Sequence, residues 1–266
     1  MPLVKPQESD IICNNHPNRG KMSSPVFTRN NSFSPSPQNP LPVTDGSVMT
    51  MENTIQKVVV SFAILLVTAG IGWFIPQLLL PAVIVGFVLV LVNSFKKEPS
   101  APLILIYAAA EGLVVGAFSS LLENYYPGIA LQAVMATFVV IGVTLALFAS
   151  GKIRESAKMT KIFMIAMLSY LAFSLLNLVL MVTDASSNPW GLRGEIVILG
   201  IPLGLILGAL AVLMGAYSLV MDFTFIQNGV RNQVPAKYGW TGAFGIVVTV
   251  VWLYLEIIRM FAIARN

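Results

Sequence analysis

Apolar residues fill seven long stretches of the chain, and short polar segments separate these stretches. A helix that crosses a bilayer needs about 20 predominantly apolar residues. Short connections between such helices favour a compact bundle of antiparallel neighbours. The pattern therefore predicts seven membrane-spanning helices, at residues 58–75, 78–95, 102–122, 129–150, 162–183, 203–226 and 238–264.

The sixth stretch is too long for a single span, because apolar residues continue over residues 196–227. As one helix it would rise about 48 Å, against a hydrocarbon core of about 30 Å. Gly200 and Pro202 provide a break, so we place the start of the span at Leu203. Residues 196–199 then form a lead-in at the membrane surface, and a short re-entrant hairpin before the proline is the alternative.

The composition indicates the class of protein. The chain is 56% hydrophobic and 11% charged, whereas soluble domains are about 45–50% apolar and about 25% charged. An all-α, polytopic membrane protein is therefore predicted. Nothing in the sequence resembles a nucleophile with its base, a phosphate-binding loop or a zinc protease motif, so we predict neither an enzyme nor a cofactor.

The first 48 residues differ from the rest, because they are rich in Pro, Ser and Asn and poor in apolar residues. Such a segment buries too little apolar surface to offset the entropy of ordering it. We predict a disordered cytoplasmic tail at 1–48, followed by a seven-helix domain at 49–266. The tail contains the single cysteine and the single histidine, Cys13 and His16, so a Cys/His metal site inside the membrane is excluded. Met22 is an alternative to Met1 as the start of translation.

Basic residues indicate the orientation, because cytoplasmic loops of membrane proteins carry an excess of Lys and Arg. A cytoplasmic N-terminus and an extracytoplasmic C-terminus give this excess, and we predict a multi-pass protein of the plasma membrane. Since the net charge of +4 comes from loops rather than from one face, nucleic-acid binding is not predicted. The inner side then contains Lys57, Lys96, Lys97, Lys152, Arg154, Lys158, Lys161, Arg231 and Lys237, and the outer side contains Arg193, Arg259 and Arg265.

Four charged residues fall inside the predicted spans. Glu111 lies in the third span and Asp222 in the sixth, and Glu256 and Arg259 lie one turn apart in the seventh. A charged side chain at the centre of a membrane helix costs roughly 2.5–3.5 kcal/mol on insertion scales. Charged residues at such positions are therefore candidates for a functional site.

Small residues share a helix face with two of these acids, which predicts that both acids face neighbouring helices. Burial disfavours the charged form of a carboxyl group, and oxygen ligands suit hard cations such as Ca²⁺. A proton-sensitive cation site is therefore our hypothesis. The faces carry Gly204, Gly208, Ala211, Gly215 and Ser218 with Asp222, and Gly242, Gly245, Thr249 and Trp252 with Glu256.

Purely structural explanations compete with this hypothesis. Glu256 and Arg259 are three residues apart and can neutralise each other on one helix. Asp222 lies close to the polar end of its span and can reach water among the headgroups. One polar site in the bundle accounts for the three acids more simply than separate explanations do.

Three segments also resemble a known family: YAAAEGLVVGAF at 107–118, YSLVMDF at 217–223 and VWLYLEIIRMF at 251–261. They resemble the transmembrane Bax inhibitor motif family, which includes Bax inhibitor 1 and YccA-like proteins. The chain looks most like the actinobacterial branch of that family. The similarity extends from about Met49 to Asn266 and leaves most of the tail outside.

The resemblance implies a seven-helix bundle with the last helix at its centre. Bacterial members are pH-sensitive calcium leak channels in which an acidic pair on the sixth and seventh helices senses protons. By motif, this pair falls on Asp222 and Glu256, where calcium would bind transiently, and the acid of the third helix is Glu111. Some members have a gating arginine at the end of the second helix, and Lys96 and Lys97 are the nearest cations here.

Two questions remain open at this point. The family resemblance pairs Glu256 with Asp222, whereas depth along the helices separates these two acids by about 10 Å and favours Arg259 as the counter-charge of Glu256. The alternative function is a non-transporting regulator that binds a membrane protease or another membrane protein, with the tail as its docking segment. The oligomeric state does not follow from the sequence.

Overall fold

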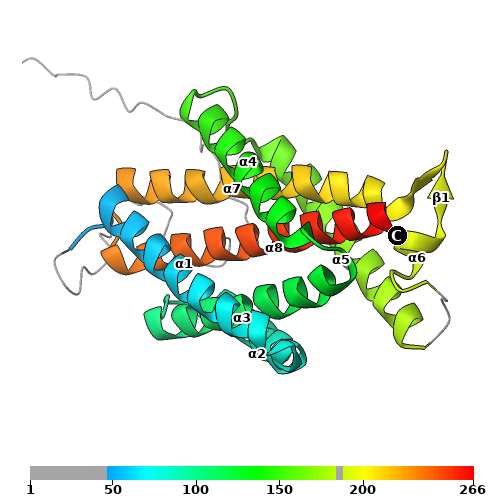
Figure 1. The fold of residues 1–266 in the computed structure, drawn as a ribbon. Coiled ribbons are helices and arrows are strands. Elements are labelled where there is room, and N and C mark those ends of the chain that lie inside the picture. The colour runs from blue at the N-terminus through cyan, green and yellow to red at the C-terminus, as the bar shows by residue number, and fades with distance from the viewer. Residues whose placement is uncertain (1–46, 184–187) are drawn as a thin grey trace, which may run out of the picture.

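The computed structural model describes residues 47–183 and 188–266. Over these residues the chain is almost entirely helical, and seven helices are long and apolar enough to cross a membrane (Figure 1). The predicted all-α polytopic membrane fold is confirmed. Nearly all of the tail predicted at 1–48 lies outside the described residues.

Short segments join the long helices except between α5 and α7, and two of these segments contain a 3-10 turn. A four-residue helix and a two-stranded hairpin precede the sixth long helix. In chain order the elements are α1 (Met51–Phe74), η2 (Pro76–Leu78), α2 (Leu79–Phe95), α3 (Ala101–Tyr125), α4 (Ile129–Ala149), α5 (Ala157–Val182), α6 (Leu192–Glu195), β1 (Val197–Ile198), β2 (Ile201–Pro202), α7 (Leu203–Arg231), η3 (Ala236–Tyr238) and α8 (Gly239–Arg265).

Two helices begin earlier than their apolar stretches, because polar residues cap them. Thr50 precedes α1, and its side chain accepts a hydrogen bond from the backbone N–H of Asn53 (3.2 Å). Ser156 caps α5 in the same way. Lys158 and Lys161, predicted in a loop, therefore lie in the first turns of α5. The C-terminal end of α7 also differs from the prediction, because this helix continues to Arg231 instead of ending at residue 226.

The last helix, α8, is the most buried of the seven spans and packs against α1, α3, α4 and α7. Its two ends contribute to different apolar clusters. Phe244 and Val247 pack with residues of α1 and α3, whereas Ile257 and Ile258 pack with residues of α3 and α4. The predicted central position of the last helix is therefore confirmed.

Glycines allow α1 and α3 to cross at very short range. A Cβ atom added at Gly116 would overlap the backbone carbonyl oxygen of Ala69, and one at Gly112 would overlap that of Leu65. Small residues four apart are a common device for close packing of membrane helices. The position of α3 against α1 therefore depends on these two glycines.

We expect Gly116→Ala to lower the free energy of unfolding by roughly 1–3 kcal/mol, because the new methyl group must push two helix backbones apart. Gly142→Ala is the matched control, since a Cβ atom at Gly142 meets only open space. Thermal unfolding in detergent measures both variants. Equal stability of the two variants would contradict the close crossing.

The segment before α7 is a short β-hairpin, and β1 pairs with β2 in antiparallel register. Its turn contains Leu199 and Gly200, both with positive φ, and Leu199 is almost fully exposed. The hairpin projects beyond the ends of α7 and α8 (Figure 1). It is therefore a lead-in at the end of the bundle and not a re-entrant segment between the helices.

The two ends of the bundle differ in charge. We call the end with the β-hairpin the hairpin end, and the opposite end, where α7 ends and α8 begins, the basic end. Arg193, Arg259 and Arg265 lie toward the hairpin end, and the other basic residues of the described segments lie at the basic end. This separation follows the predicted distribution of Lys and Arg.

Candidate functional site

Glu256 lies on α8 near the hairpin end, and its side chain is only 3% exposed. Two guanidinium groups contact its carboxylate. Arg193 of α6 approaches Oε2 at 3.4 Å, and Arg259, one turn further along α8, donates to Oε1. Glu256 therefore pairs with Arg259, as one prediction had it, and also with an arginine that the sequence had placed in an outer loop.

Arg193 is itself buried, with a side chain 5% exposed. Its Nη2 donates hydrogen bonds to the hydroxyl of Tyr170 (2.9 Å) and to Ser174 Oγ (2.8 Å), both on α5. Its guanidinium also lies over the Tyr170 ring, 5.1 Å from the centroid. We call Glu256, Arg193, Arg259, Tyr170 and Ser174 the charge cluster. It connects α5, α6 and α8 through one buried anion.

Asn177 of α5 positions the short helix that carries Arg193. Its Oδ1 accepts a hydrogen bond from the backbone N–H of Leu192 (2.7 Å), and its Nδ2 donates to the carbonyl of Trp190 (3.3 Å). Gly191 between them has a φ of 60° and passes so close to Asn177 that a side chain would collide with it. The backbone before α6 is therefore docked onto α5, which directs Arg193 inward.

Asp222 lies on α7 and is buried, with 5% of its surface exposed. The hydroxyl of Thr249 on α8 donates to its Oδ2 (2.8 Å), and Ser218 lies within hydrogen-bond distance of the same hydroxyl (3.1 Å). We call Asp222, Thr249 and Ser218 the hydroxyl cluster. The small-residue faces predicted around the two acids meet in part at the interface of α7 and α8, where Ser218 contacts Thr249 and Gly215 lies against Trp252.

The two acids lie at different depths. Thr249, which contacts Asp222, precedes Glu256 by about two helical turns, a rise of about 10 Å. Trp252 and Leu253 lie between these levels and pack against Gly215 of α7, where an added Cβ would approach both side chains closely. The acidic pair implied by the family resemblance is therefore not in direct contact, as the depth count had indicated.

Glu111 lies elsewhere, on α3, and is half-buried. It hydrogen-bonds with Tyr107 one turn earlier and faces Gly86 of α2, where an added Cβ atom would lie 3.0 Å from its Oε1. Glu111 therefore contacts α2 and its own helix, and it lies away from the interface of α7 and α8. The structure does not bring it together with Asp222 and Glu256 in one cluster.

A family model described as Bax inhibitor 1 like matches residues 18–266. The chain belongs to this family. No curated protein matches the chain. In this Bax inhibitor 1-like protein, the three segments that resemble the family lie in α3, α7 and α8, and α8 packs against both other helices.

Lys96 and Lys97 follow α2 at the basic end of this Bax inhibitor 1-like protein, and both side chains are exposed. Glu256 and Asp222 are buried, and their contacts are with arginines and hydroxyl groups. The structure therefore gives the two lysines no contact with these acids. Their proposed gating role remains a prediction.

No three His, Cys, Asp or Glu side chains cluster closely enough to hold a metal ion within residues 47–183 and 188–266. A cation at Asp222 would need further oxygen ligands, and the hydroxyl groups of Ser218 and Thr249 are the nearest. Such a site has few charged ligands, which suits transient rather than tight binding.

Arg193 is the residue of the charge cluster that sequence reasoning did not connect with Glu256. Its position between the fifth and sixth spans indicated an outer loop, and nothing in the local sequence shows that this loop folds inward. The sequence signal that could have identified Arg193 was Glu256, the acid that it contacts, and not the arginine itself. A buried carboxylate needs more compensation than one neighbouring charge provides, and Arg193 is the basic residue between those spans.

Proposed function

We propose that this protein is a pH-sensitive cation leak of the plasma membrane, with calcium as the expected ion. The observation that carries the proposal is the pair of buried carboxylates at two depths of the interface between α7 and α8, Asp222 in the hydroxyl cluster and Glu256 in the charge cluster. In this proposal the N-terminus is cytoplasmic, the C-terminus is extracytoplasmic, and the chain belongs to the actinobacterial branch of its family.

The described conformation corresponds to a closed state in this proposal. Trp252 and Leu253 fill the space between the two acids against Gly215, so an apolar layer separates the two polar clusters. At the hairpin end, Arg193 and Arg259 bind the two carboxylate oxygen atoms of Glu256, so these atoms are not free to bind a cation. Ion passage therefore requires α7 and α8 to change their packing.

Loss of negative charge at the two buried acids, Asp222 and Glu256, is the proposed trigger, as the family resemblance implies for this pair. Glu256 faces Arg193 from α6, Arg259 from α8 and Tyr170 from α5, and Asp222 faces the two hydroxyl groups of the hydroxyl cluster. A neutral Glu256 would leave Arg193 buried without an anion, which is strongly unfavourable. We therefore expect α6 to detach from α8 on acidification, which frees α8 to change its packing against α7, so the leak increases as pH falls. Asp222 supplies the oxygen atoms that attract the cation.

Calcium flux in proteoliposomes with an entrapped dye tests the proposal across a series of pH values. We expect wild-type flux to rise on acidification, Glu256→Gln to leak at every pH, and Asp222→Asn to reduce flux by on the order of tenfold, which corresponds to about 1.4 kcal/mol. Glu52→Gln is the control, because Glu52 is an exposed carboxylate in the first turn of α1.

Two outcomes would contradict the proposal. One is a wild-type flux that does not exceed that of protein-free vesicles or that ignores pH. The other is a flux that still rises on acidification, as in wild type, in the double variant Asp222→Asn, Glu256→Gln. Absence of any flux would favour the alternative of a non-transporting regulator that binds a membrane protease or another membrane protein.

A further inference from the structure

A groove of about 1090 Å³ runs along the side of the bundle formed by α1 and α4. Both helices pack on α8 and have little contact with each other, so residues of α7 and α8 form the floor between them (Figure 1). The lining is almost entirely apolar. Leu66, Leu131 and Phe138 on its walls are about two-thirds exposed, so the groove opens sideways toward the bilayer.

The hydroxyl groups that line the groove already have partners. Ser119 and Tyr254 share a hydrogen bond (2.6 Å), Thr137 donates to the carbonyl of Ala133 (2.7 Å), and Thr54 donates to that of Thr50 (2.8 Å). A polar occupant would find no free partner among these groups. The interior of the groove therefore fits a hydrocarbon chain.

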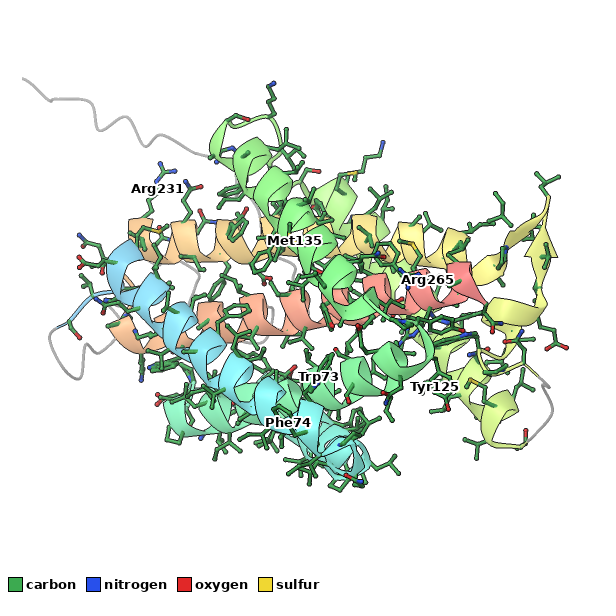
Figure 2. The ribbon with its side chains drawn as sticks, viewed as in Figure 1. Trp73, Phe74, Tyr125, Met135, Arg231 and Arg265 are labelled. Atoms are coloured by element: carbon green, nitrogen blue, oxygen red, sulfur yellow. The ribbon has the colours of Figure 1, made fainter. Side chains whose placement is uncertain are left out.

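The basic end of the groove has the opposite character. Arg154 Nη1 donates to Oε1 of Gln227 (3.2 Å), and its guanidinium lies 5.3 Å from the ring centroid of Phe148; both contacted residues line the groove. Arg231 lies one turn beyond Gln227 on α7 and projects from the same end of the bundle (Figure 2). Two exposed cations therefore flank the mouth of an apolar groove.

These two cations lack an acidic partner within the described residues. The ion pairs there join Glu256 to two arginines and Glu98 to Lys237. Glu155, next to Arg154 in the chain, accepts a hydrogen bond from Thr160 Oγ1 of α5 (3.4 Å). Partial burial raises the pKa of the Glu155 carboxyl, and this hydrogen bond partly offsets the effect. Its contact with α5 leaves the positive charge at the groove mouth unpaired.

We propose that an anionic phospholipid of the surrounding bilayer binds in this groove, with an acyl chain between α1 and α4 and its phosphate between Arg154 and Arg231. Basic pockets between membrane helices bind anionic headgroups, and guanidinium groups form strong hydrogen bonds with phosphate. The bound chain would contact Val250, Val251 and Tyr254 of the central helix. This binding does not depend on the proposed ion leak.

Native mass spectrometry of the full chain in detergent, with phosphatidylglycerol or phosphatidylcholine of the same acyl chains, tests the proposal. We expect wild type to retain phosphatidylglycerol preferentially. Arg154→Gln with Arg231→Gln should remove this preference, since each basic residue near an anionic headgroup changes the binding constant roughly fivefold. Lys158→Gln with Lys161→Gln is the control, because it removes equal charge from exposed positions on α5.

A second pair of variants tests the groove itself. Gly70 lines the groove and Gly142 of α4 does not, and an added Cβ atom meets open space at both positions. Gly70→Leu should therefore reduce retention of both lipids severalfold, whereas Gly142→Leu should retain them as wild type does. Three results would overturn the proposal. They are an equal loss of phosphatidylglycerol preference in both charge variants, unchanged lipid retention in Gly70→Leu, and a second copy of the chain bound in place of lipid.

Discussion

Glu256→Gln is expected to lower the free energy of unfolding by about 3–5 kcal/mol, because it leaves Arg193 buried without an anion. The glutamine keeps a hydrogen-bonding group in the same place but removes the charge that faces two guanidinium groups. Tyr170 and Ser174 offer Arg193 only neutral oxygen atoms. Reversible unfolding in mixed micelles measures this loss.

Glu98→Gln is the control for this substitution. Glu98 forms an ion pair with Lys237 (3.0 Å), but its side chain is 66% exposed. Exposed ion pairs contribute about 0–1 kcal/mol, so this variant should be close to wild type. Similar losses in the two variants would show that the buried position of Glu256 does not matter, and would contradict the charge cluster.

Arg193→Met is expected to lower the same free energy by about 3 kcal/mol and to increase ion flux at neutral pH. The loss lies at the low end of the range for a broken buried ion pair, because Arg259 still faces Glu256. Methionine keeps apolar contacts with Phe173 and Tyr170 but cannot bind the carboxylate, so α6 loses its link to α8. Flux therefore rises without a change to either acid.

Arg265→Met is the matched control for the arginine. Arg265 also lies at the hairpin end, but it is exposed and donates to Gln132 Oε1 (2.6 Å) and to the carbonyl of Pro127. We expect little change in stability or flux for this variant. If Arg193→Met unfolds no more easily than Arg265→Met and leaks no faster than wild type, α6 does not close the hairpin end.

The helices were predictable from the sequence because the apolar stretches are long and the connections short. The starts of α1 and α5 were not, since Thr50 and Ser156 extend these two helices into polar sequence that hydropathy assigns to loops. The break before Leu203 was correctly placed by Gly200 and Pro202. Hydropathy alone could not distinguish a surface lead-in from a re-entrant hairpin.

The candidate site was predictable only in part. Periodicity placed Asp222 and Glu256 on small-residue faces, and counting depth separated them by the same distance that the positions of Thr249 and Glu256 on α8 give. Arg193 was not predictable, because its burial depends on Asn177 holding the backbone before α6 against α5. That is a tertiary contact between residues distant in sequence.

The central claim is that Glu256 interacts with Arg193 in the charge cluster, and that Asp222 lies in the separate hydroxyl cluster. Two double-mutant cycles in one unfolding assay test it most directly. Arg193→Met with Glu256→Gln should show a coupling energy on the order of 1–3 kcal/mol, whereas Asp222→Asn with Glu256→Gln should be additive within about 0.5 kcal/mol. Strong coupling between the two acids, with additivity between Arg193 and Glu256, would contradict the account.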